Sequence, residues 1–320
     1  MWDDDTLIAA LPLGLARRRV TLKLPIKVLT LSMLYDDRVG FHDVLIRPGH
    51  ETAAASQLIA ACKQTGARYM DLTPLRPSPA TQALRSAANG RWSHERVEIV
   101  SSFADVSAGW DAYLAQRSSN TRKQMRKRLR QMESDGAVAR YARREDADAG
   151  DILQDVFAVS AKSWKATNGT DIGSKAQDRA FFEALFYGMQ DSCRMMAGVL
   201  YLNDKPVANE ILLNLRGDIF NLMSDYDEGY ANHGVGTTVL CVSLRNACDE
   251  NARHMDFLRQ TPFLESYADN TQDLVRLRIA LRPSLAPLLI RGQFAVRGLR
   301  ERLFGAKTRV TGRRKFFGMR

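Results

Sequence analysis

The segment "GYANHGVGTTVLCVSLRNACDENARHMDFL", Gly229–Leu258, places Gly234 and Gly236 directly before a helical pattern that ends at a short apolar strand. Glycine permits a sharp turn of the chain, which is a sufficient structural reason for the pair. Glycines at a helix start also leave backbone N–H groups uncovered at the positive end of the helix dipole, where phosphates bind. Gly-Val-Gly alone favours the structural explanation, so the surrounding elements must decide.

Three strands with short turns precede this segment. The turns "NDKP" and "RGD" separate three patterns with a period of two, "RMMAGVLYL", "VANEILLNL" and "IFNLMSDYD". This arrangement predicts a three-stranded antiparallel meander that leads into the glycine turn, a helix over Thr237–Glu250 and the strand "HMDFL". A similar order of strands, helix and strand occurs near residues 6–73. We therefore expect an α/β fold built as two units in tandem, each a mixed, mostly antiparallel sheet flanked by helices.

The rest of the chain gives the domain boundaries. A polar, proline-containing stretch from Arg76 to Glu98 is interpreted as a connection, and four helical patterns follow it up to residue 190. A length of 320 residues fits about two domains. We expect a degenerate first unit over residues 1–95, incomplete at its N-terminus, a complete domain over 96–275, and a basic amphipathic tail over 276–320.

Composition limits the partners and the location. The net charge is +10, and the segment from Arg276 to Arg320 holds 13 Lys/Arg and one acid, so the remaining chain carries −2. The four cysteines show neither CxxC spacing nor a cluster with histidines, which predicts reduced thiols and no metal. The acidic start and the absence of a long apolar run predict a cytoplasmic protein. No helix-turn-helix or zinc pattern supports DNA binding.

Several stretches together resemble one enzyme family. The order of the meander, the glycine turn, the helix and the next strand is similar to the core of GNAT acyltransferases, in particular the CelD-like branch of polysaccharide biosynthesis, related to FemAB-like tandem proteins. The resemblance rests on Tyr226, Asp227, Tyr230 and the two glycines, on "MDFLR", on "NTRKQMRKRLRQME" and on "SAKSWKATNG". The stretch "RQTPFLESYA" departs from the family pattern, which has a Gly-Asp and Tyr-Lys run there.

The resemblance implies acetyl-CoA or another acyl-CoA as the donor, with no metal. Backbone N–H groups of the turn hold the pyrophosphate and the strand edge at "NLMSDY" holds the pantetheine arm. The implied donor-binding residues are Leu222, Met223, Ser224, His233, Gly234, Val235, Gly236, Thr237 and Thr238.

Candidate catalytic and acceptor residues follow from the same region. Glu210 is an acid in an otherwise apolar strand and is the candidate base; an outward-facing position in an alternating strand is the alternative. Tyr267 is the candidate acid for the leaving thiolate, with His233 as a substitute. The candidate acceptor-binding residues are Trp164, Lys165 and Arg259, although a core position is the commoner one for a helical tryptophan.

Two basic stretches suggest anionic partners. Residues Arg117 to Arg130 hold seven Lys/Arg and no acid, which is typical of a solvated helix face or of a cradle for a nucleotide-sugar, a lipid-linked sugar or tRNA. In the tail, Leu285, Leu289 and Val296 lie on one helical stripe with arginines beside it. That pattern fits either packing against the body or peripheral contact with an anionic inner membrane face.

The sequence therefore predicts an acyltransferase that moves an acyl group from acyl-CoA to an amine or hydroxyl of a sugar or glycan precursor. Two alternatives stay open. One is a FemAB-like transferase that uses aminoacyl-tRNA, and the other is a non-catalytic adaptor of a polysaccharide assembly.

Overall fold

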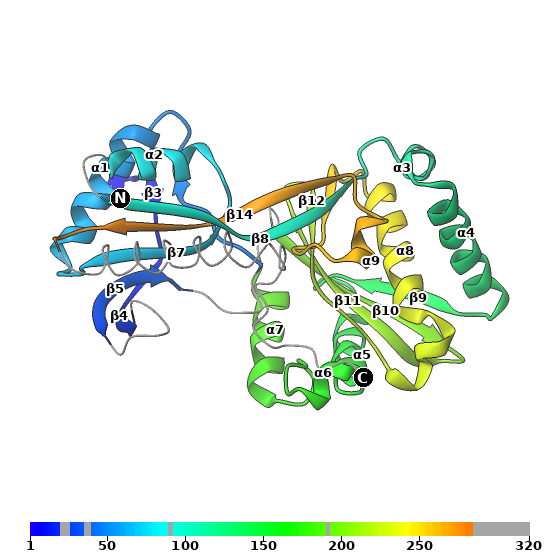
Figure 1. Ribbon diagram of the computed structural model, residues 1–320. Coiled ribbons are helices and arrows are strands. Elements are labelled where there is room, and N and C mark those ends of the chain that lie inside the picture. The colour runs from blue at the N-terminus through cyan, green and yellow to red at the C-terminus, as the bar shows by residue number, and fades with distance from the viewer. Residues whose placement is uncertain (20–25, 35–39, 89–91, 190–192, 284–320) are drawn as a thin grey trace, which may run out of the picture. The chain divides into compact units, whose positions relative to one another are not determined.

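The computed structural model describes residues 1–19, 26–34, 40–88, 92–189 and 193–283 (Figure 1). The chain divides into two compact units, one from Met1–Val100 with the segment from Asp273 onwards, and one from Ser101–Gln272. The chain leaves unit 1 within strand β8 (Ser93–Asp105) and returns to it within β14 (Asn270–Ala280). Most of the predicted tail, from residue 284 onwards, lies outside the described residues.

Unit 1 is a sheet flanked by two helices. Strand β5 pairs antiparallel with β4 and parallel with β7, and β7 pairs antiparallel with β14. The bounds are β4 Leu13–Arg19, β5 Lys27–Met33, β7 Tyr69–Leu75, α1 Glu51–Gln64 and α2 Pro79–Ala87, with short strands β1 Trp2–Asp3, β2 Thr6–Leu7, β3 Ala9–Ala10 and β6 Leu45–Ile46. Helices α1 and α2 pack together over a core of apolar residues from both helices and from strands β5, β7 and β14.

The expected connection from Arg76 to Glu98 was wrong. The side chain of Ser78 accepts a hydrogen bond from the Thr81 N–H, and Pro79 occupies the first turn, so a capped helix, α2, begins there. Leu84 of this helix is fully buried. The first part of β8 then follows within the same stretch. Proline disrupts the interior of a helix, but it is favoured at the first helical position, which Pro79 occupies near the start of α2.

Unit 2 contains the predicted meander. Strands β9, β10, β11 and β12 pair antiparallel in that order, β12 pairs parallel with β13, and β13 pairs antiparallel with the end of β8. The bounds are β9 Val138–Ala142, β10 Cys193–Leu202, β11 Lys205–Leu215, β12 Asp218–Tyr226 and β13 His254–Asp256. The expected α/β class, mixed and mostly antiparallel sheets flanked by helices, is confirmed.

Helices cover both faces of this meander (Figure 1). Helix α8 packs on one face together with α3 and α4, while α5 and α7 pack on the other. The bounds are α3 Trp110–Gln116, α4 Ser119–Ser134, α5 Ala149–Ser160, α6 Trp164–Thr167, α7 Ala176–Gly188, η1 Glu228–His233, α8 Val235–Asp249 and α9 Pro262–Glu265. Because both faces are covered, the stretch Val207–Leu212 of β11 is buried throughout.

Strand β12 separates from its neighbour part-way along its length. Its pairing with β13 is limited to Asp218–Phe220, although the strand continues to Tyr226. The register with β11 shifts at Leu222, which marks a β-bulge. Within the described residues, the edge of β12 from Asn221 onwards therefore has no strand partner on the β13 side.

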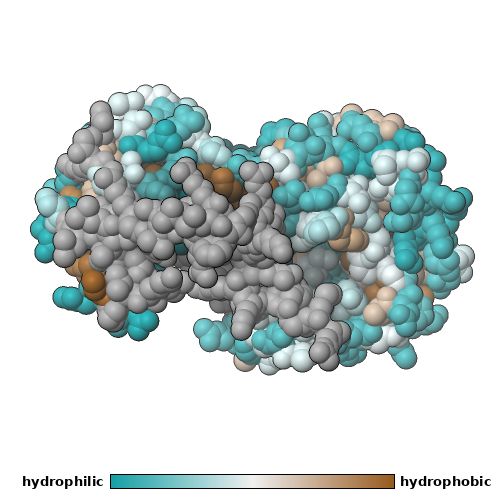
Figure 2. Space-filling view, viewed as in Figure 1, coloured by the Kyte–Doolittle hydropathy of each residue, from teal (hydrophilic) through white to brown (hydrophobic). Residues whose placement is uncertain are grey.

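The surface is mostly hydrophilic on the face shown in Figure 2, including the side of unit 2 where α4 lies. Helix α4 contributes six Lys/Arg, and apart from Thr121 and Met125 its side chains are at least partly exposed. In the part of the chain that the structure describes, no helix is both long and apolar enough to cross a membrane.

Candidate active site

A cavity of about 210 Å³ lies beside the unpaired edge of β12. Its wall combines that edge, the first turns of α8, the segment after β13 and the start of α6. The lining residues are Trp164, Lys165, Asn221, Leu222, Met223, Ser224, Gly236, Leu240, Phe257, Arg259, Thr261, Phe263 and Leu264. Seven of the residues predicted from the sequence thus meet in one place, although they lie up to 95 positions apart in the chain.

The glycine turn starts helix α8 in a constrained geometry. Gly234 has φ of +68° and caps the helix, a conformation that favours glycine. The N–H groups of Thr237 and Thr238 both donate to the Gly234 carbonyl at 3.0 Å. Among the described residues, the N–H groups of Val235 and Gly236 have no acceptor outside the helix. Of the five N–H groups from Gly234 to Thr238, those of Val235 and Gly236 therefore remain available to a ligand.

Arg128 of α4 sits directly on this turn. Its guanidinium donates to the His233 carbonyl at 3.2 Å and occupies the space that a Cβ at Gly234 would take. With Lys127, Thr237 and Tyr267 it lines a second cavity of about 320 Å³. Phe263 of α9 lines both cavities, and the neighbouring residues Gly236 and Thr237 line the first and the second respectively, so the two cavities are adjacent.

Glu210 is fully buried on β11, on the α8 side of the sheet. The Ser243 hydroxyl on α8 donates to Oε2 and the Ser224 hydroxyl lies 3.4 Å from Oε1. Burial raises the pKa of Glu210 to about 7, against the opposing hydrogen bonds of Ser243, Asn221 and Ser224. The inward position excludes the alternative that this carboxylate faces solvent.

A row of residues in register crosses the sheet through Glu210. Gly198 on β10 pairs with both Tyr141 of β9 and Glu210, and Glu210 pairs with Ser224 of β12. A Cβ at Gly198 would collide with the Tyr141 ring, so glycine lets this ring lie across β10. The Tyr141 hydroxyl thereby reaches Ser243 at 2.8 Å. One hydrogen-bonded chain then runs from Tyr141 to Ser224.

Lys165 fixes the opposite face of β12. Its ammonium contacts the buried Asp225 carboxylate at 2.5 Å and donates to the Ser224 carbonyl at 3.1 Å. The Ser160 hydroxyl holds the other Asp225 oxygen at 2.7 Å. Lys165 lines the cavity, and its ammonium holds β12 through these contacts.

The remaining predicted residues are divided among three positions. Trp164 is half-buried and Arg259 is exposed, and both line the cavity beside β12. Tyr267 is buried and lines the second cavity but not the first; burial raises the pKa of its phenol to about 12. The His233 ring is exposed and lies 5.6 Å from the Tyr230 ring.

Sequence reasoning missed Asn221, Ser243, Tyr141 and Arg128. Ser243 lies two turns into the predicted helix, on its apolar side, and a hydroxyl there was a usable signal. Tyr141 belongs to β9, which the sequence did not predict, and its contact depends on Gly198. No spacing in the sequence links these segments.

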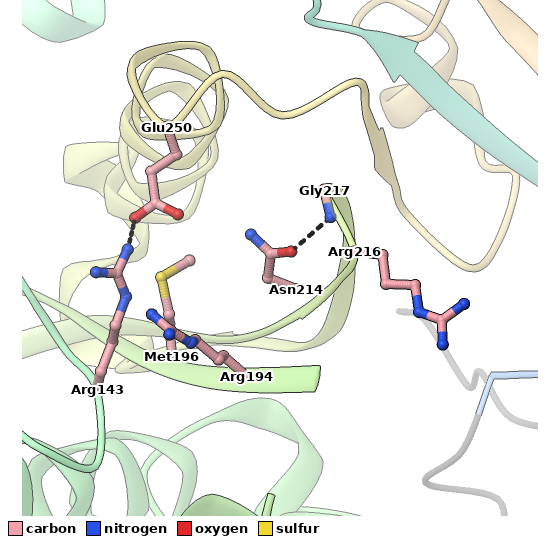
Figure 3. Close-up of a pocket in the computed structure, with 7 residues that line it drawn as sticks. All are labelled: Arg143, Arg194, Met196, Asn214, Arg216, Gly217 and Glu250. Atoms are coloured by element: carbon pink, nitrogen blue, oxygen red, sulfur yellow. Dashed lines mark hydrogen bonds and ion pairs between the residues drawn. The ribbon is translucent and has the colours of Figure 1, made fainter. Parts of the chain in front are cut away.

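A third cavity, of about 300 Å³, lies at the opposite end of α8 (Figure 3). Arg143 is paired there with Glu250 at the helix C-terminus, and Arg194 and Arg216 complete a basic lining with Asn214. Figure 3 shows Arg216 directed away from the other labelled side chains. Because neither the glycine turn nor any other site residue predicted from the sequence lines this cavity, it is not the candidate active site.

The described residues hold no group of three or more His, Cys, Asp or Glu that could bind a metal ion. All four cysteines are free thiols, and Cys62, Cys241 and Cys248 are buried.

Comparison with known proteins agrees with this geometry. Residues 119–267 match the acetyltransferase (GNAT) domain. This GNAT domain includes the meander, helix α8 and every residue of the candidate site. No curated protein matches the chain. The CelD-like branch stays a prediction.

Solved structures show the same fold over most of the chain. The C-terminal domain of a putative lysylphosphatidylglycerol synthetase from Agrobacterium fabrum aligns with a TM-score of 0.56 at 11% identity, covering 84% of each chain. L-PGS from Bacillus licheniformis aligns with a TM-score of 0.56 at 12% identity, covering 82% of this chain and 83% of that one. FemX aligns with a TM-score of 0.53 at 8% identity, covering 87% and 86%. At these identities the likeness concerns the fold.

Proposed function

We propose that the GNAT domain transfers an acyl group from acyl-CoA to an amine or hydroxyl of an acceptor. One observation carries this proposal. The unpaired edge of β12 and the uncovered Gly236 N–H border the same cavity. An extended chain with amide groups pairs with a strand edge, and a phosphate binds at a helix N-terminus. Acyl-CoA is a donor that joins these two features in one molecule.

The residues present suit the parts of this donor. Val235 and Gly236 offer N–H groups to the pyrophosphate, and Arg128 and Lys127 bring positive charge to the same turn. The edge from Asn221 to Ser224 is available to the pantetheine amides. The thioester would then lie near Ser224, next to the buried carboxylate.

The chemistry is attack of the acceptor's lone pair on the thioester carbon, with loss of its proton and departure of the thiol. A base with a pKa close to the operating pH is the most effective proton acceptor. Glu210, whose pKa burial raises to about 7, meets this condition. A sugar or glycan precursor as the acceptor follows from the family resemblance and stays a prediction.

Calorimetric titration with CoA and with pantetheine, which lacks the phosphates, tests the donor. We expect CoA to bind the wild-type chain more tightly than pantetheine. Arg128→Met should weaken CoA binding roughly tenfold or more, the effect of losing a charged hydrogen bond, and leave pantetheine binding unchanged. Arg130→Met is the matched control, because Arg130 is an exposed residue of the same helix that lines neither cavity. Equal affinities of the wild type for CoA and pantetheine would contradict phosphate binding at the turn.

A tRNA-linked donor is the second candidate, because α4 exposes most of its six Lys/Arg beside the site. Titration of the same protein with aminoacyl-tRNA at several salt concentrations distinguishes the two. Binding of tRNA that weakens steeply with salt, without CoA binding, would replace acyl-CoA as the donor. Binding of neither would favour a non-catalytic adaptor.

A further inference from the structure

The Glu210 carboxylate is separated from the cavity that the acceptor would enter. Its side chain has no exposed surface, and it does not line the cavity. A base must come within hydrogen-bond distance of the proton it removes, directly or through one intervening group. Some other group must therefore connect this carboxylate with the cavity.

Two described side chains both line the cavity and hydrogen-bond Glu210, namely Ser224 and Asn221. An amide such as Asn221 can donate a hydrogen bond but does not pass a proton on, because its nitrogen has no basic lone pair. A hydroxyl can accept one proton while it gives another away. Ser224 is the chemically competent connection of the two.

The position of Ser224 agrees with this role. It is exposed, although its strand partner Glu210 is fully buried. Its hydroxyl lies 3.4 Å from Glu210 Oε1, which is longer than an ordinary O–H···O hydrogen bond. The hydroxyl is therefore not locked onto the carboxylate and can rotate between Oε1 and the cavity.

The opposite side of the carboxylate is held in place. Ser243 donates to Oε2, and the Tyr141 hydroxyl hydrogen-bonds Ser243 at 2.8 Å. The chain on this side ends at Tyr141. Burial raises the pKa of the Tyr141 phenol, so this hydroxyl stays protonated. Oε1 is thus the oxygen left to receive a proton.

We propose that Ser224 relays the acceptor's proton from the cavity to Glu210, with Ser243 and Tyr141 as positioning residues. This inference rests on the proposed acyl transfer. As the acceptor nitrogen or oxygen bonds to the thioester carbon, its proton moves to Ser224 Oγ and the serine's own proton moves to Glu210 Oε1. The C–S bond breaks, and Glu210 returns the proton through Ser224 to the departing thiolate. The acceptor then carries the acyl group in place of its proton, and the CoA sulfur carries a proton in place of the acyl group.

Infrared titration of the Glu210 carboxyl tests the connection without any substrate. The Glu210 signal is the difference between the wild type and Glu210→Gln. Ser224→Ala removes a hydrogen bond to the ionised form and should raise the carboxyl pKa, while Ser224→Thr should restore the wild-type titration. Ser56→Ala, an exposed helical position in unit 1, is the control. An unchanged titration in Ser224→Ala would overturn the proposal.

Acyl transfer from acetyl-CoA to glucosamine, followed as released thiol across a pH series, tests the proton movement. Ser224→Ala should lower the rate about 100-fold, within the range of general base catalysis, and move its rise to higher pH; Ser224→Thr should recover most of the rate. Unchanged CoA affinity with an unchanged rate in Ser224→Ala would refute the relay and leave the acyltransferase intact. Failure of the wild type to bind CoA would instead refute the proposed donor. The infrared titration would still test whether Ser224 hydrogen-bonds the Glu210 carboxyl.

Discussion

Asp71 in unit 1 and Glu210 in unit 2 are both carboxylates buried on a sheet strand, and they differ in their partners. Asp71 on β7 receives two hydrogen bonds from Arg276 at 2.7 Å and lies 3.3 Å from Arg278, both on β14. Glu210 on β11 is met by the hydroxyls of Ser243 and Ser224 and by an amide. Both side chains are buried, but the partners of Asp71 are charged and the partners of Glu210 are neutral.

This difference sets the ionisation of the two groups. Burial opposes the charge on Asp71, yet the hydrogen bonds and charges of Arg276 and Arg278 outweigh it and hold the pKa below its usual value. At Glu210 burial prevails and the pKa rises to about 7. Asp71, which lies between two guanidinium groups, is therefore ionised and joins two strands. Glu210, with neutral partners, changes its protonation near neutral pH, which is what a base requires.

The largest expected effect is at the charged site. Asp71→Asn leaves two guanidiniums without their central carboxylate, so we expect a loss of about 3–5 kcal/mol in the free energy of unfolding. Urea denaturation followed by tryptophan fluorescence measures it. Glu210→Gln at pH 5 is the control, since it replaces a protonated carboxyl by a neutral amide of similar shape. Equal losses in the two variants would remove the distinction between the sites.

The pH dependence of stability should have opposite signs at the two sites. Burial raises the pKa of Glu210 from its ordinary value of 4.5 to about 7, so its stabilisation is fully present below pH 4.5 and is lost as the pH rises from there through 7. The loss amounts to about 3 kcal/mol. Asp71 has a lowered folded pKa, so its stabilisation is present above pH 4 and is lost as the pH falls.

Unfolding curves of the wild type and Glu210→Gln at pH 5 and pH 8 isolate the first of these effects. The stability of the wild type relative to the variant should fall between the two pH values. A constant difference would show that Glu210 titrates in the same range folded and unfolded.

The smallest effects are expected at the outer partner of each site. Tyr141→Phe removes the hydroxyl that contacts Ser243, and Glu98→Gln removes the charge 3.3 Å from Arg276. Each should cost about 1 kcal/mol or less, because the inner contacts remain. Thermal unfolding at pH 7 measures both. If Tyr141→Phe lowered the free energy of unfolding as much as Asp71→Asn does, the hydrogen-bonded chain from Tyr141 to Ser224 would act as one cooperative unit.

The fold was predictable where local patterns carry it. The turns "NDKP" and "RGD" and the glycines before α8 gave the meander and its following helix. Strands β8, β9 and β14 were not predicted. β14 carries two arginines, and its buried Arg278 is accommodated in the sheet by an ion pair with Asp71, about 200 positions earlier.

The candidate site was predictable only in part for the same reason. Glu210 stood out as a single acid in an apolar strand, and the residues of "NLMS" follow from the strand order. Asp71 in "YMDLTPL" offers the same local signal. What separates the two is the identity of their partners, which come from β14 for one and from α8 and β12 for the other. Partners of that kind depend on tertiary packing.

The position of β14 in the chain has a consequence for synthesis. Unit 1 needs β14 beside β7, yet β14 follows the whole of unit 2 in the sequence. During synthesis, β7 and Asp71 must therefore wait for some 200 further residues before β14 emerges from the ribosome. The strands of unit 2 lie in one continuous segment, Ser101–Gln272, apart from the parts of β8 and β14 that belong to unit 1. Domains generally fold as units in the order in which they are completed. The later half of this protein is thus the first to mature, and the earlier half is finished last.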